Sequence, residues 1–168
     1  MGIDINKEGI DFLKSELGYQ DIKCADILND EIPDITEHSW DYLLMGEVLE
    51  HIDDPVLFLS RIKEKFSGVI GQLLITVPNA FAWLNVKYAL KHMEFINSDH
   101  RYWFTPYTLG KILIRADIRV GDFRFCEYLP PTRGAGVAGG LGRIFSLGNF
   151  LRKRYPALRN VLVMEAEL

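Results

Sequence analysis

The chain has few of the features that mark secreted, membrane-spanning or cysteine-rich proteins. It holds only 2 cysteines, Cys24 and Cys126, far apart in its 168 residues, so neither a disulfide framework nor a cysteine metal cluster is expected. No basic region or apolar core follows Met1, which argues against a signal peptide. The longest uncharged stretch, residues 66–86, is broken by glycine, proline and asparagine and does not predict a transmembrane helix. These absences favour a cytoplasmic globular protein.

Acidic and basic residues are divided unevenly along the chain, whose net charge is −4. Residues 1–60 hold 15 acids and 3 bases, residues 61–127 hold 6 and 10, and residues 128–168 hold 2 and 6. The basic C-terminal part could attract an anionic substrate or surface, although solvated helix faces produce the same unevenness. Basic and aromatic residues are not interleaved in a stripe, so no nucleic-acid partner is expected.

Short apolar runs alternate with helical patterns, which is typical of an α/β protein. Asn6, Asp54 and Thr105 have the chemistry of helix N-caps, and a proline follows each of the last two. The pattern predicts strands at 2–5, 22–25, 40–45, 73–77, 118–128 and 161–166, and helices at 7–17, 55–66, 81–95 and 106–115. This order predicts a Rossmann-like, doubly wound, mostly parallel sheet in a single domain, residues 1–168.

Within that domain, the glycine-rich and basic residues 130–156 are predicted to form a loop or lid. Residues 134–139, Gly-Ala-Gly-Val-Ala-Gly, match the dinucleotide-binding fingerprint in letters. Two prolines separate them from the preceding strand, however, and no acidic residue follows at the required spacing, so a nucleotide site is not expected there. The apolar and basic residues of this segment would allow a peripheral membrane contact.

Two aspartates stand at the ends of predicted parallel strands, where open α/β sheets bind ligands. Asp4 could accept hydrogen bonds from a ribose diol, or it could simply cap the helix that follows. Asp26 could accept from an exocyclic amine while Ile27 presses on a purine ring, or it could serve only turn formation.

A third group of polar residues follows the strand at 40–45. Gly46 would allow close backbone approach to a ligand, and Glu47 and His51 leave the same strand end four residues apart. The carboxylates and histidine of residues 50–54 could suggest a metal site, but a hard cation needs oxygens from several segments and zinc needs more nitrogen or sulfur. No metal is therefore expected.

These motifs together resemble the class I S-adenosylmethionine-dependent methyltransferases, in the branch with small-molecule members such as the quinone-biosynthesis O-methyltransferases. The resemblance extends over residues 2–128 and is carried by five segments: Asp4, Asp26, Glu47-Val48-Leu49-Glu50-His51, Thr76-Val77-Pro78-Asn79 and Asp99-His100-Arg101-Tyr102-Trp103-Phe104-Thr105-Pro106. It implies S-adenosyl-L-methionine as cofactor and methyl transfer to an oxygen or nitrogen of a small molecule.

The resemblance also implies a role for each matching residue. Asp4 would bind the ribose and Asp26 the adenine amine, with Ile5 and Ile27 along the base. Near the reacting end, Gly46 and Glu47 would bind the cofactor, and Glu47 and His51 would be the catalytic pair. Asn79, His100 and Tyr102 would line the pocket for the methyl acceptor.

The family's first strand and glycine-rich turn have no counterpart before Gly2, so the domain is expected to be incomplete at its N-terminus. A start codon assigned too late, a true truncation or a second chain could each explain the difference. Loss of a central strand would expose two rows of backbone groups, and these open edges would allow a homo-oligomer. The alternative to an enzyme is therefore a non-catalytic interaction or oligomerisation module derived from the same fold.

Overall fold

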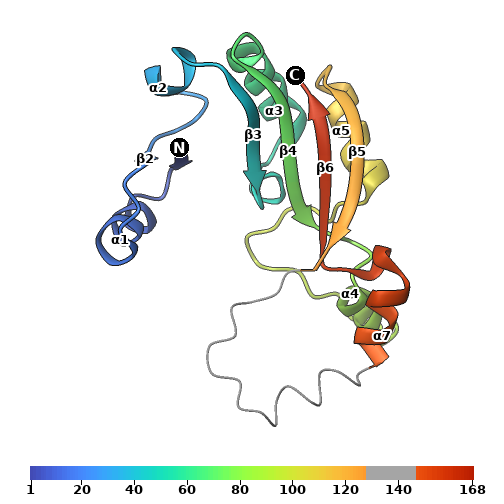
Figure 1. Ribbon diagram of the computed structural model, residues 1–168. Coiled ribbons are helices and arrows are strands. Elements are labelled where there is room, and N and C mark those ends of the chain that lie inside the picture. Colours follow the sequence, from blue (N-terminus) through green and yellow to red (C-terminus); the bar gives the residue numbers. More distant parts are fainter. Residues whose placement is uncertain (128–146) are drawn as a thin grey trace.

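The computed structural model describes residues 1–127 and 147–168, which contain two β-sheets (Figure 1). In the smaller sheet β1 (Gly2–Asp4) and β2 (Ile22–Cys24) run parallel, joined by α1 (Lys7–Leu17). The larger sheet has the order β3-β4-β6-β5, with β3 at Trp40–Gly46, β4 at Ile70–Pro78, β6 at Val161–Glu167 and β5 at Arg119–Cys126. The structure thus confirms the α/β fold class.

Strand β6 is the one strand of the larger sheet that runs against the others. Strand β4 is parallel to β3, whereas β6 is antiparallel to both of its neighbours, β4 and β5. The strands β3, β4 and β5 therefore share one direction, and the last strand of the chain is inserted between two of them. The larger sheet is mixed: of its three strand pairings β3–β4 is parallel and the two made by β6 are antiparallel, so it is less parallel than the sequence predicts.

The main helices begin where the sequence predicts, because their N-caps are formed by side chains. Asp54 caps α3 (Pro55–Phe66) by accepting a 2.9 Å hydrogen bond from the Leu57 amide. Thr105 caps α5 (Pro106–Arg115) in a reciprocal pair with Thr108. The Asn6 side chain accepts from the third amide of α1. Each cap satisfies backbone donors that the first helical turn leaves unpaired.

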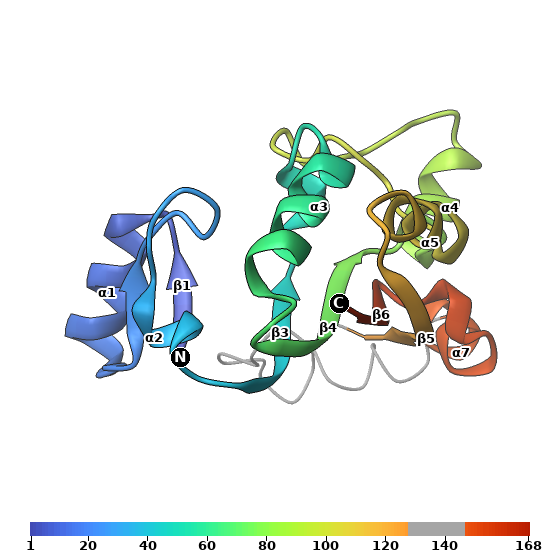
Figure 2. The ribbon, with the colours of Figure 1, turned by 90° about the horizontal axis from the view of Figure 1, so that it is seen from above.

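Helices α3 and α5 cover the same face of the larger sheet (Figure 2). Alternate residues of β4 and β6 are buried beneath them, as expected for strands with one face on a core. The fully buried centre consists of Leu59, Ile62 and Phe66 from α3, Leu109 and Leu113 from α5, and Leu73, Ile75, Val77 and Leu162 from the strands. In β3, Tyr42 and Leu44 are more than half exposed.

Several segments differ from the sequence prediction. Helix α4 (Trp83–Ala89) ends well before Phe95, because His92 adopts φ 56° and the Met93 amide bonds back to the Tyr88 carbonyl at 3.1 Å. Part of the predicted loop at 130–156 is instead α7 (Leu147–Arg154), while residues 130–146, with the Gly134–Gly139 motif, lie outside the described residues.

Three short helical turns complete the described elements: α2 (Pro33–Thr36), η1 (Leu49–His51) and η2 (Pro156–Leu158). None of the described helices combines the length and apolar character that crossing a bilayer requires.

Asn79 corrects one expectation from the sequence. Its side chain is wholly buried at the end of β4, and both amide hydrogens are used, toward the carbonyls of Ala157 at 2.8 Å and Arg159 at 2.7 Å. Its oxygen accepts from the Phe81 amide at 3.0 Å. Asn79 therefore joins the end of β4 to the turn before β6 and does not face an acceptor pocket.

We predict that Asn79→Ala lowers the free energy of unfolding by about 2–4 kcal/mol, because three partly buried backbone groups lose their hydrogen-bond partner. Urea unfolding followed by circular dichroism would measure the change. The matched control is Asn97→Ala at an exposed position, which should cost far less. Equal losses in the two variants would contradict the role assigned to Asn79.

Candidate active site

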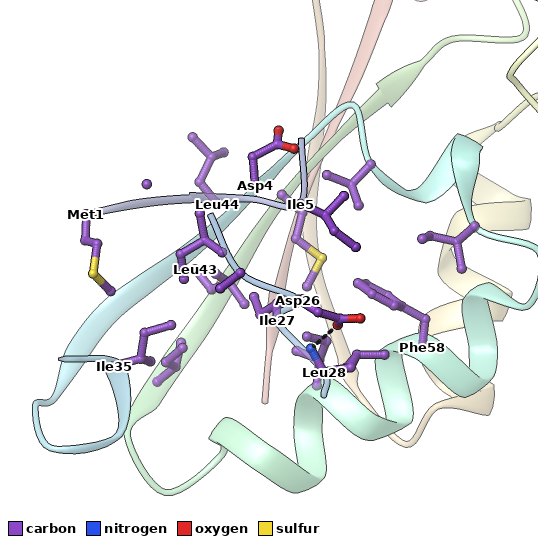
Figure 3. Close-up of a pocket in the computed structure, with 18 of the residues that line it drawn as sticks. Met1, Asp4, Ile5, Asp26, Ile27, Leu28, Ile35, Leu43, Leu44 and Phe58 are labelled. Atoms are coloured by element: carbon purple, nitrogen blue, oxygen red, sulfur yellow. Dashed lines mark hydrogen bonds between the residues drawn. The ribbon is translucent and has the colours of Figure 1, made fainter. Parts of the chain in front are cut away.

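A cavity of about 1100 Å³ opens between the smaller sheet and strand β3 (Figure 3). It follows the edges that β1 and β3 leave unpaired, since β1 bonds only to β2 and β3 only to β4. Its lining includes the sequence-predicted residues Asp4, Ile5, Asp26, Ile27, Glu47 and His51. The two aspartates therefore lie on one side of a single cavity, with the Glu47 turn on its other side.

Asp4 ends β1 with its carboxylate exposed at the cavity. One oxygen accepts a 2.7 Å hydrogen bond from the Asn6 amide, which fixes the side chain at the entry to α1. The other oxygen makes no hydrogen bond to the described residues. Ile5, next in the chain, is 72% exposed, so an apolar side chain stands beside a free acceptor.

Asp26 is held more rigidly than Asp4, in the turn that follows β2. One carboxylate oxygen accepts from the amides of Leu28 at 2.9 Å and Asn29 at 3.2 Å, and the other accepts from the Asn29 side chain at 2.8 Å. The bond from the Asn29 side chain is the main reason that the pKa of Asp26 lies below its usual value. The Asp26 carboxylate therefore stabilises the turn, and its remaining lone pairs still allow it to bind a ligand.

Lys65, near the end of α3, connects the Asp26 turn to the larger sheet. Its ammonium donates to three backbone carbonyls of that turn, those of Ile27 at 3.1 Å, Leu28 at 3.3 Å and Asp30 at 2.6 Å. Three donors of one ammonium are matched by three acceptors. This contact ties the Asp26 turn to α3, which packs on the larger sheet. The sequence showed only a basic residue on the solvent side of a helix.

Glu47 occupies a left-handed turn at the end of β3, with φ 55°. Its amide donates to the Thr76 carbonyl at 3.0 Å and lies 3.2 Å from the Thr76 hydroxyl, so strand β4 fixes the turn. The preceding Gly46 is extended, and a Cβ placed there would meet only the Thr76 hydroxyl at 3.9 Å. No protein neighbour requires glycine at position 46, and its approach to a cofactor stays a prediction.

Glu50, His51 and His100 converge behind the Glu47 turn. Their ligand atoms all lie within 4.8 Å of one another, and the two imidazole rings meet edge to face with centroids 4.8 Å apart. His51 Nδ1 lies 3.1 Å from the Asp99 carbonyl, which makes Nδ1 the donor and leaves Nε2 as the acceptor. Burial is the main cause that lowers the pKa of His100, so its neutral form is favoured.

Glu50 is fully buried, yet neither of its carboxylate oxygens has a hydrogen-bond partner among the described residues. Burial raises its pKa to about 7, since the charged form loses its hydration. From the sequence, Glu50 belongs to the Glu47–His51 motif and to a group of residues that could suggest a metal site, which was not expected. An acidic residue at a position that should pack inward, between Leu49 and His51, was the available signal.

The segment that carries His100 is tied to the turn after β3. The Arg101 amide donates to the Glu50 carbonyl at 2.7 Å, and the Arg101 guanidinium forms an ion pair with Asp53. The Tyr102 hydroxyl donates to the Asp53 carbonyl at 2.6 Å. The structure therefore brings His100 against His51, but neither His100 nor Tyr102 belongs to the cavity lining, and the Tyr102 hydroxyl is already engaged.

Comparison with known proteins identifies the fold. Neither family models nor curated protein sequences match the chain, but solved structures do. A SAM-dependent methyltransferase from Archaeoglobus fulgidus shares 20% identity at a TM-score of 0.54, over 99% of this chain and 75% of that one. Magnesium protoporphyrin IX methyltransferase from Synechocystis, solved with bound SAH, shares 13% sequence identity with a TM-score of 0.52. The match covers 99% of this chain and 62% of that one.

The small RNA methyltransferase HEN1 is also similar, with 17% identity and a TM-score of 0.56, over 98% of this chain and 20% of that one. This architecture is therefore shared by one protein named for a porphyrin substrate and another named for small RNA. The chain has the Rossmann-like fold of S-adenosylmethionine-dependent methyltransferases. A shared fold does not by itself establish a shared activity.

We predict that Lys65→Met loosens the Asp26 turn, because three carbonyl acceptors lose their donor. Amide hydrogen exchange should become about tenfold faster at Leu28 and Asn29. The control is Lys63→Met on the same helix, whose ammonium pairs with Asp117 instead. Unchanged exchange in Lys65→Met, or equal acceleration in both variants, would contradict the contact.

Proposed function

We propose that the protein is a cytoplasmic S-adenosylmethionine-dependent methyltransferase that acts on an oxygen or nitrogen of a small molecule. The observation that supports this proposal is the placement of Asp4, Asp26, Glu47 and His51 around one cavity. Two carboxylates on one side and an acid and an imidazole on the other match the two ends of a nucleoside-based methyl donor.

The residues around the cavity suit the adenosine half of the cofactor. The free oxygen of Asp4 can accept from a ribose hydroxyl, and the ionised Asp26 can accept from the adenine amine. Ile5 and Ile27 provide apolar contact for the base. The bound cofactor supplies an electrophilic methyl group on a sulfonium, so the protein's part is mainly to position the acceptor.

His51 is suited to remove a proton from the acceptor. The Asp99 carbonyl holds the proton on Nδ1, which leaves the lone pair of Nε2 free. The imidazole is exposed at the cavity, within reach of an acceptor hydroxyl or amine bound there. Glu47, on the same turn, is placed to orient the acceptor or the sulfonium end of the cofactor.

A second candidate role for this end of the site is to bind a divalent cation. The sequence favours no metal, but Glu50, His51 and His100 offer one carboxylate and two imidazoles. The carboxylate is buried without a partner, which is costly unless a cation or a proton neutralises it. Such a mixed oxygen and nitrogen set suits zinc or another transition-metal ion, which would lower the pKa of a coordinated acceptor hydroxyl.

We expect the chain to bind S-adenosylhomocysteine and the variants Asp4→Asn and Asp26→Asn each to bind it about tenfold more weakly, because each loses a charge-assisted hydrogen bond. Isothermal titration calorimetry would measure the three dissociation constants. Asp11→Asn on α1, which keeps the same change in charge away from the cavity, is the control and should bind normally.

Absence of binding by the unmodified chain would favour the alternative, a non-catalytic interaction module. The unpaired edges of β1 and β3 are the observation behind that alternative, since exposed edges can pair with another chain. Sedimentation at several protein concentrations would then show a homo-oligomer. A monomer that binds S-adenosylhomocysteine would exclude this alternative.

Glu50→Gln should abolish binding of Zn²⁺ or Mn²⁺, because the amide removes the only anionic ligand of the three-residue group. Titration of the metal-free protein with each ion, followed by calorimetry, would test this. Glu64→Gln, at an exposed position on α3, is the matched control. Equal metal affinity in both variants would contradict a cation site at Glu50. His51 would then be expected to act as a base without help from a metal ion.

A further inference from the structure

A second surface, away from the cavity, lies where α4 and α7 pack together at one end of the larger sheet (Figure 1). The two helices approach closely at Gly148, where a Cβ would stand 2.7 Å from the Trp83 indole nitrogen. We call residues 81–95 and 148–154 the α4–α7 surface. Neither the cofactor-binding residues nor the histidine pair belongs to it.

The α4–α7 surface exposes large apolar side chains. Six of them are from about half to three quarters exposed: Leu90 at 75%, Phe150 at 64%, Phe95 at 62%, Met93 at 55%, Phe81 at 50% and Leu84 at 47%. A groove of about 400 Å³ opens among them, lined in part by Phe81, Phe95 and Trp103. Such a concentration of exposed apolar groups is typical of an interaction surface.

Exposed basic side chains occur in the same two segments. Lys87, Lys91, Lys153 and Arg154 are exposed, and Glu94 is the only acidic residue of the surface. The fifth cation, Arg152, pairs with Glu127 at 3.2 Å. The surface is therefore strongly positive, although the chain as a whole carries a net charge of −4.

We propose that the α4–α7 surface docks the protein on an anionic phospholipid bilayer. Lysines and arginines around exposed leucine, methionine and phenylalanine side chains give attraction to lipid headgroups together with apolar insertion at the acyl boundary. Pairing of this surface with the same surface of a second copy would bring like charges together, so the charge argues against that two-fold self-association. The proposal does not depend on methyl transfer.

Flotation with vesicles tests this proposal on the full chain. We expect binding to vesicles of phosphatidylcholine and phosphatidylglycerol in equal parts, weak binding to phosphatidylcholine alone, and release at high salt. The double variant Lys87→Glu/Lys91→Glu should lower partitioning by more than tenfold, since each cation near an anionic surface contributes about fivefold. Leu90→Ser/Phe150→Ser should weaken binding at every salt concentration.

The matched controls change exposed residues on α1: Lys7→Glu/Lys14→Glu and Phe12→Ser. They should bind like the unmodified chain, and circular dichroism should show that every variant is folded. Equal binding of the unmodified chain to both vesicle types, no binding to either, or an equal loss in the α1 controls would overturn the proposal. Binding to an acidic protein instead of vesicles would also overturn it.

Discussion

The candidate cofactor site depends on the contact between the Lys65 ammonium and the three carbonyls of the Asp26 turn. Strands β1 and β2 do not bond to the larger sheet, so the relative position of the two sheets is not fixed by a ladder of hydrogen bonds. Apolar contacts of Ile3, Ala25 and Ile27 with the main core provide attraction without direction. The hydrogen bonds of the Lys65 ammonium are directional, so they define the separation between the two sides of the cavity, which the apolar contacts alone do not.

The reacting end of the site is held by different means. Strand β4 anchors the Glu47 turn through Thr76, and the 99–102 segment is bound to the turn after β3 through Glu50 and Asp53. These contacts lie on the larger sheet, which has a continuous core under α3 and α5. The histidine pair and Glu50 are therefore positioned independently of the smaller sheet. The reacting end of the site is thus fixed by the larger sheet, whereas the cofactor end is positioned mainly by Lys65.

Features encoded by local chemistry could be predicted from the sequence. The caps Asp54 and Thr105 define helix starts without reference to the rest of the chain, and strand ends place Asp4 and Asp26 at one cavity. The insertion of β6 between β4 and β5 could not be predicted, because the alternation in Val161–Glu167 specifies a buried face but no partner. The structural role of Asn79 could not be predicted because it arises from bonds to a distant segment, and the burial of the Glu50 side chain likewise follows from tertiary packing.

Of the 3 tryptophans of the chain, one lies at the cavity and two lie in or beside the α4–α7 surface. Trp40 lines the cavity between the sheets, Trp83 packs beneath α7 at Gly148, and Trp103 lines the groove of the α4–α7 surface. Indole emission depends on local polarity and quenching. A variant that keeps only Trp40 would therefore report on the cavity, and variants that keep only Trp83 or only Trp103 would report on two places of the α4–α7 surface, without an added label.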